Sequence, residues 1–115
     1  MDNIDPILRE TLSDMLGAGI DYWADITDYE SDDNDLATAV TLEDAEDDGA
    51  TYRVTLEDYY TAANSWAKKN FDAEYDFYQR FARNWVAQNW QDLDWDVRIS
   101  DEILQEAIFH EQKYS

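Results

Sequence analysis

The sequence predicts an α+β fold, in which a small three-stranded antiparallel sheet packs against helices. Three segments alternate apolar and polar residues as strands do, and segments on both sides of them repeat apolar residues at helical spacing. An acid-rich turn ending in Gly49 joins the second and third strands, as in a β-hairpin. A chain of 115 residues has room for one modest core, and no linker or repeat divides it. Residues 1–115 are therefore predicted to form a single acidic domain.

The three strands are expected over residues 20–26, 36–42 and 50–56, where the alternation is clearest. The acid-rich segment 28–35 lies between the first and second strands and is expected to be a solvated loop. This arrangement predicts a three-stranded meander.

One helix is expected before the sheet and two to three after it, from apolar residues spaced three and four apart. Thr55 followed by Asp58 resembles a capping box, in which each residue's side chain bonds the other's backbone N–H. The expected helix starts lie near Pro6, Thr55, Asp72 and Ser100.

Charge is the most informative feature of the composition. The formal net charge is −20, from 28 acids against 8 bases, whereas a magnitude of roughly 2–8 is ordinary for a small domain. Residues 1–58 carry 18 of the acids and 2 of the bases, so the excess lies in the half that contains the sheet. Such an excess costs stability through self-repulsion, which favours a functional reason for it.

Several kinds of chemistry are excluded or weakly supported. Without cysteine there is no disulfide, thiolate metal site or cysteine nucleophile. His110 is the only histidine, and with Glu106 it could be half a metal site or an acid–base pair; a surface contact at i,i+4 spacing is favoured. Zinc needs three or four ligands, which this chain does not supply. The sequence contains no phosphate-binding glycine loop either. No enzymatic activity and no cofactor are expected.

One segment of the sequence partly resembles a calcium-binding loop. Asp44, Glu46, Asp48 and Gly49 match the first half of an EF-hand loop, with glycine at the sixth position. The twelfth position is Thr55, where a bidentate glutamate is required, and the flanking segments resemble strands. No metal site is expected.

The chain also lacks features of a membrane or exported protein. Its first residues contain no basic and apolar signal segment, and no apolar run approaches the roughly 20 residues that cross a bilayer. Anionic lipids would repel an acidic surface. A cytoplasmic protein without membrane contact is expected.

The acidic residues of the sheet half suggest imitation of nucleic acid. Duplex DNA offers one negative charge per roughly 1.7 Å of axis, and a surface studded with carboxylates can offer a similar density. Such a protein would occupy the basic cleft of a nucleic-acid-binding protein and would not bind nucleic acid itself. The candidate partner-binding residues are Asp21, Asp25, Asp28, Glu30, Asp32, Asp33, Asp35, Glu43, Asp44, Glu46, Asp47 and Asp48.

Two alternatives stay open. Halophilic adaptation also enriches a chain in acids, although it should spread them evenly over the surface. A structural or assembly protein could use the same charge to meet a different basic partner. Four aromatic residues lie among acids, and such residues are favoured interface anchors, so a homodimer seam or a target contact is possible at Trp23, Tyr29, Trp90 and Trp95.

Three stretches, residues 16–24, 52–58 and 107–114, resemble a family of small uncharacterised acidic proteins from actinobacterial phages. These proteins share a glycine-rich stretch ending in Tyr-Trp, a helix start of the form Tyr-x-(Val/Leu)-Thr-(Leu/Ile)-x-Asp, and a closing Ala-(Leu/Ile)-Phe-Gly-Glu-x-x-Tyr. Ala18 and His110 stand here where the family has glycine.

This resemblance implies a phage origin and a similar strand order, but it supplies no activity. By analogy with small acidic phage proteins that resemble DNA mimics, it implies an inhibitor of a host nucleic-acid-binding defence protein, such as a CRISPR-Cas effector or a restriction enzyme. The alternative within this class is a phage structural or assembly factor.

Overall fold

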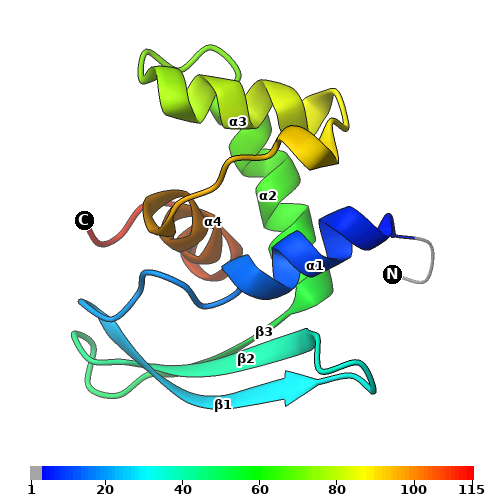
Figure 1. Ribbon diagram of the computed structural model, residues 1–115. Helices are drawn as coiled ribbons and strands as arrows, with labels where there is room; N and C mark the ends of the chain where they lie inside the picture. The colour runs from blue at the N-terminus through cyan, green and yellow to red at the C-terminus, as the bar shows by residue number, and fades with distance from the viewer. Residues whose placement is uncertain (1–3) are drawn as a thin grey trace.

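The computed structural model describes residues 4–115, in which the chain forms one three-stranded antiparallel sheet and four α-helices (Figure 1). This confirms the α+β class, with a helix before the sheet and three after it. The elements in chain order are α1 (Pro6–Met15), β1 (Ala24–Ser31), β2 (Ala37–Asp44), β3 (Thr51–Thr55), α2 (Leu56–Asn70), α3 (Asp76–Val86), the short 3₁₀-helix η1 (Trp90–Asp92) and α4 (Val97–Phe109).

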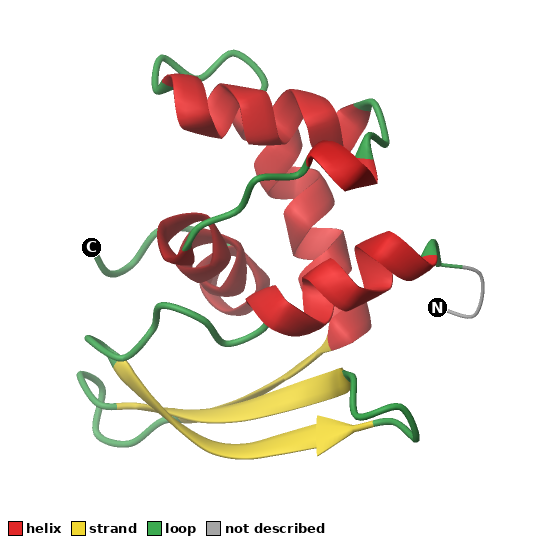
Figure 2. Cartoon of the chain, viewed as in Figure 1, coloured by secondary structure: helices red, strands yellow, loops and turns green. Residues whose placement is uncertain are grey.

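The helices lie on one side of the sheet, with α1, α2 and α4 next to it and α3 farthest away (Figure 2). No helix within residues 4–115 covers the opposite face of the sheet (Figure 2). The two faces therefore meet different surroundings, and residues at successive positions of each strand must suit one or the other.

The sheet is a meander in the order β1-β2-β3. Ile26, Leu42 and Tyr52 lie side by side across the three strands. Leu42 is fully buried, and Ile26 and Tyr52 pack against the core. A register shift between Ile26 and Asp28 marks a β-bulge at Thr27, which changes the alternation of β1 halfway along its length.

One hydrophobic core joins this inner face of the sheet to the helices. Its largest fully buried side chains come from all four α-helices, from the turn before β1 and from β2, so the layers are held by shared packing. They include Trp23, Tyr59, Trp66, Phe81 and Ile103.

The N-cap residue matches the expected one at the start of α2 but not at the start of α4. Thr55 and Asp58 form the expected capping box at the start of α2. The last helix begins earlier than expected: Asp96 caps α4 by accepting bonds from the backbone N–H groups of Arg98 and Ile99. Ser100, expected as the cap, lies inside the helix and is fully buried. Aspartate caps as well as serine does, so either sequence position was chemically suitable.

The helix that was expected to start near Asp72 begins four residues later, since α3 runs from Asp76 to Val86. Tyr75 and Val86, at its two ends, are about half exposed.

The first strand was placed too early. Residues 20–23 form a turn, in which Ile20 O accepts hydrogen bonds from the backbone N–H groups of Trp23 and Ala24. Gly19 precedes that turn with φ of 80°, a left-handed conformation that costs glycine little. β1 then runs through Asp28 to Ser31, which were expected to be loop, so only residues 32–36 connect β1 to β2.

Candidate functional site

The outer face of the sheet carries carboxylates instead of apolar side chains. Asp25 and Glu43 are directly opposite each other on β1 and β2, and both are exposed. Asp28 and Glu30 continue the same side of β1 beyond the bulge. Like charges at opposed positions destabilise a sheet, so this arrangement lowers stability where nothing in the fold requires acids.

The acid-rich loops extend this surface at the two ends of the sheet. In a meander, successive turns lie at opposite ends, so the β1–β2 loop and the β2–β3 turn are separated by the length of β2. The eight residues of β2 span about 23 Å at 3.3 Å per residue. The outer face of the sheet bridges that distance. We call the whole surface the acidic face, and its ten residues are Asp25, Asp28, Glu30, Asp32, Asp33, Asp35, Glu43, Glu46, Asp47 and Asp48.

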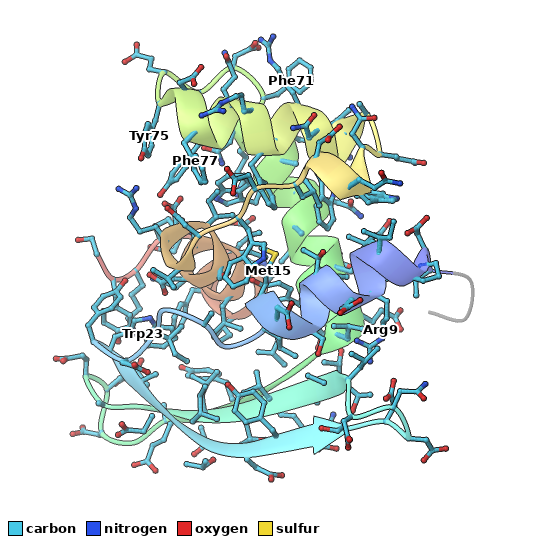
Figure 3. The ribbon with its side chains drawn as sticks, in the orientation of Figure 1. Arg9, Met15, Trp23, Phe71, Tyr75 and Phe77 are labelled. Atoms are coloured by element: carbon cyan, nitrogen blue, oxygen red, sulfur yellow. The ribbon has the colours of Figure 1, made fainter. Side chains whose placement is uncertain are left out.

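Three bases pair with this surface. Arg53 binds Glu30 through two hydrogen bonds, from Nε at 2.7 Å and from a terminal nitrogen at 2.9 Å. Arg9 of α1 lies near the end of the sheet that carries the β1–β2 loop (Figure 3). Its guanidinium is 3.1 Å from the Asp32 carboxylate. A longer ion pair, at 3.6 Å, joins Lys113 to Asp47 in the β2–β3 turn. Within residues 4–115 the other seven carboxylates form no salt bridge.

Local hydrogen bonds hold one carboxylate of the β1–β2 loop, that of Asp32, in place. The Asp32 carboxylate accepts bonds from the backbone N–H groups of Asn34 at 2.8 Å and Leu36 at 3.1 Å. These bonds, with Arg9, lower the pKa of Asp32, and the hydrogen bond from Arg53 lowers the pKa of Glu30. Both groups therefore remain charged at neutral pH and occupy fixed positions.

Two of the twelve predicted binding residues lie elsewhere. Asp44 has no exposed surface, and its carboxylate accepts hydrogen bonds from the Tyr114 hydroxyl at 2.7 Å and the Glu46 backbone N–H at 2.8 Å. It holds the C-terminal segment to the sheet and is not available to a partner. Asp21 lies in the turn before β1, where its charge contributes to the raised pKa of Tyr29.

A second set of carboxylates, on α4, was not expected from the sequence. Asp101 is 6% exposed and accepts hydrogen bonds from the Tyr22 hydroxyl at 2.5 Å, the Trp23 indole at 2.8 Å and the Gln105 amide at 3.0 Å. Trp23 points into the space between the sheet and the helices (Figure 3). Asp101 thus ties the turn before β1 to α4.

The next carboxylate of α4, Glu102, accepts hydrogen bonds from the Trp66 indole at 3.2 Å and from the Tyr78 hydroxyl. These two donors lie on α2 and α3, so Glu102 joins three helices. Every donor to Asp101 and Glu102 is an uncharged group.

Glu106, which was expected to make a surface contact with His110, is buried between helices. Glu106 is 7% exposed and pairs with Lys69 of α2 at 2.6 Å and with the Ser65 hydroxyl at 3.1 Å. His110 is exposed and lies past the end of α4 with φ of 58°. The carboxylate therefore links helices, and within residues 4–115 no hydrogen bond or ion pair joins it to the histidine side chain.

A cleft of about 700 Å³ opens beside the start of α4. It lies between the turn before β1, α3 and the last residues of the chain, and its walls are mainly aromatic and aliphatic. We call it the tyrosine cleft, and it is lined by Gly19, Tyr22, Tyr78, Val97, Arg98, Asp101, Glu102, Gln112, Tyr114 and Ser115.

No family model, curated protein or solved structure matches the chain.

The acidic face and the tyrosine cleft are thus the two surfaces with a distinctive chemistry. Among residues 4–115, no group of three or more His, Asp and Glu side chains is arranged to hold a metal ion. Nor is any helix of that range both long and apolar enough to cross a bilayer. The arrangement of exposed carboxylates can attract cations and basic surfaces over a wide area.

Three phenols with raised pKa values give the stability a specific dependence on pH. Burial, with the hydrogen bond to Asp101, raises the pKa of Tyr22 to about 12, and burial raises the pKa of Tyr59 and Tyr78 as well. A phenol with an ordinary pKa of about 10 in the unfolded chain then releases its proton earlier than in the folded protein. The contribution of these phenols to stability should be constant below pH 10 and fall as pH rises from 10 to 12. Urea unfolding across this range measures the effect, and Tyr22→Phe should show a shallower fall. Identical pH profiles for both proteins would remove Tyr22 from this account.

Proposed function

We propose that the protein binds a basic, nucleic-acid-binding protein through the acidic face and blocks it by occupying the positions of phosphates. The observation that carries this proposal is the set of carboxylates on a sheet face that no helix of residues 4–115 covers, continued at both ends by acidic turns. Charge that served only solubility would have no reason to accumulate at opposed strand positions, where it destabilises the sheet.

The charge density of this surface suits a phosphate-binding groove. One strand of duplex DNA places a phosphate every 3.4 Å, so about seven lie along the 23 Å of β2. Over that length and its two flanking turns, the acidic face has ten carboxylates against the three bases that pair with them, an excess of seven negative charges. A groove that accommodates a nucleic-acid strand would therefore meet a similar total charge.

The rest of the molecule shows a different charge pattern, which favours this function over general adaptation to salt. On α3 and just before it, Arg80 pairs with Asp76 and Arg83 with Asp72. Acids and bases there offset one another, whereas the sheet half keeps its excess. Halophilic adaptation should enrich both halves in unpaired acids. If the chain comes from a phage, a restriction enzyme or CRISPR-Cas effector is the kind of partner that this chemistry fits.

Affinity capture tests the proposal directly. Immobilised protein is incubated with host lysate, with and without excess duplex DNA, and the retained proteins are identified by mass spectrometry. We expect retention of one or a few nucleic-acid-binding proteins and their loss when DNA competes. Retention of virion components, or of proteins that DNA does not displace, would instead support a structural or assembly role.

A further inference from the structure

The residues that line the tyrosine cleft include two carboxylates and one cation. Asp101 and Glu102 both line the cleft, and uncharged groups donate all their hydrogen bonds. The one cation of the lining, Arg98, forms its ion pair with Asp96 at 3.3 Å and donates a hydrogen bond to the Tyr75 hydroxyl at 2.7 Å. The guanidinium is therefore engaged at the rim.

The walls of the cleft add to this preference for a cation. Tyr22 and Tyr78 contribute phenol rings, whose faces attract positive charge. The ring of Tyr114 stacks on Trp23 and already has the Lys113 ammonium at 5.3 Å. Tyr75 stands at the neighbouring edge of α3 (Figure 3), where its ring already carries the Arg98 guanidinium at 5.3 Å. Carboxylates below and aromatic rings at the sides are the groups that hold organic ammonium ions.

We propose that the tyrosine cleft binds an alkylammonium group of the kind that a lysine side chain carries. A guanidinium fits less well, since it needs both oxygens of one carboxylate for its two-pronged contact. In Asp101 one oxygen already accepts from Trp23 and Gln105 and the other from Tyr22. An ammonium is a compact point charge that needs no such paired geometry.

The source of the lysine is the basic partner, and in this respect the inference rests on the proposed function. The cleft adjoins the β2–β3 end of the acidic face, because Tyr114 of its lining bonds Asp44 at the end of β2 and the neighbouring Lys113 pairs with Asp47. A basic protein seated on the acidic face therefore has the cleft at its edge. A second copy of this chain is a poor occupant, since two molecules of charge −20 repel each other.

The test uses a free lysine derivative, so that it does not depend on finding the partner. The indole N–H groups of Trp23 and Trp66 donate to the two carboxylates, and their NMR signals report directly on them. Titration with Nα-acetyl-lysine amide should shift both signals saturably. The Trp85 indole, which donates to Asn64 at 2.8 Å, is the internal control and should not respond. Potassium chloride at the same ionic strength should shift none of the three.

A pair of variants separates charge from shape. Val97 is 55% exposed and lies four residues before Asp101 on α4, so both side chains are on one side of the helix. Val97→Lys places an ammonium group of the protein itself beside the carboxylates and should weaken binding of the lysine derivative at least tenfold. Val97→Gln has a similar length without the charge and should retain binding.

Several results would overturn the inference. One is an equal shift of the Trp23 and Trp66 signals by the Nε-acetylated derivative, whose side chain has no charge. The others are a parallel response of the Trp85 signal and unchanged binding of the lysine derivative by Val97→Lys. Such a failure would leave the acidic face untouched. Conversely, a saturable lysine titration without any DNA-displaceable protein in the capture experiment would retain the cleft and reject the proposed function.

Discussion

Neutralising the outer face of the sheet is expected to weaken partner binding by about a thousandfold while the fold is retained. The variant Asp25→Asn, Asp28→Asn, Glu43→Gln removes three exposed carboxylates that form no salt bridge among the described residues. A close charge pair across an interface contributes roughly 1.5 kcal/mol or more, about tenfold in affinity. Loss of three such pairs should also slow association, because steering by the field decreases. Surface plasmon resonance with the captured partner measures both constants.

The matched control changes the same number of charges in the helical half. Glu74→Gln, Asp94→Asn, Glu111→Gln alters exposed side chains for which no ion pair is found in residues 4–115. It should reduce affinity several-fold at most, through the lower net charge alone. Equal losses from both variants would mean that total charge matters and the acidic face has no special role. The sheet variant should unfold at an equal or slightly higher temperature, since opposed Asp25 and Glu43 repel each other.

Replacing Asp101 by leucine is expected to have the largest effect on stability. The change leaves the fully buried Trp23 indole and the Tyr22 hydroxyl without their acceptor, and removes one of the acceptors of the Gln105 amide. Breaking a buried network of this kind costs about 3–5 kcal/mol. For a domain of this size that corresponds to a fall in Tm of about 15 °C or more.

Thermal unfolding by circular dichroism measures this difference, with Asp94→Leu as the exposed control. Asp94 lies in the segment between η1 and α4, and its side chain is exposed. Its replacement should change stability by no more than about 0.5 kcal/mol, as is usual for surface positions. A loss below about 1 kcal/mol for Asp101→Leu would show that the network contributes little.

The order of the elements could be predicted because it depends on local patterns. Alternation in β2 and β3 and the capping box of Thr55 and Asp58 gave the meander and the start of α2. The boundaries of β1 failed for equally local reasons. The alternation of residues 20–26 continues into a turn set by Gly19, and the bulge at Thr27 interrupts it on the other side.

The roles of individual acids could not be predicted, because they depend on partners distant in the sequence. Asp101 is satisfied by Tyr22, 79 residues away, and Asp44 by Tyr114, 70 residues away. In the sequence they look like any other acid of an acidic chain. The one available signal was aromatic: phenols and indoles placed among acids are donors, and Trp23 and Tyr22 proved to be donors to a buried carboxylate.

The spatial layout of the acidic face also differs from its expected form. Its two acidic turns lie at opposite ends of the sheet, as a meander requires. The continuous surface between them is provided by Asp28 and Glu30, which were expected to be loop, together with Asp25 and Glu43.

The most direct test of charge mimicry is whether the partner can hold this protein and nucleic acid at the same time. Fluorescently labelled duplex DNA is bound to the purified partner, and this protein is added at increasing concentration and at several salt concentrations. Charge mimicry predicts full displacement of DNA, with an affinity for the protein that falls linearly with salt on a log–log scale, as DNA binding does. A stable complex containing the partner, the DNA and this protein would contradict it.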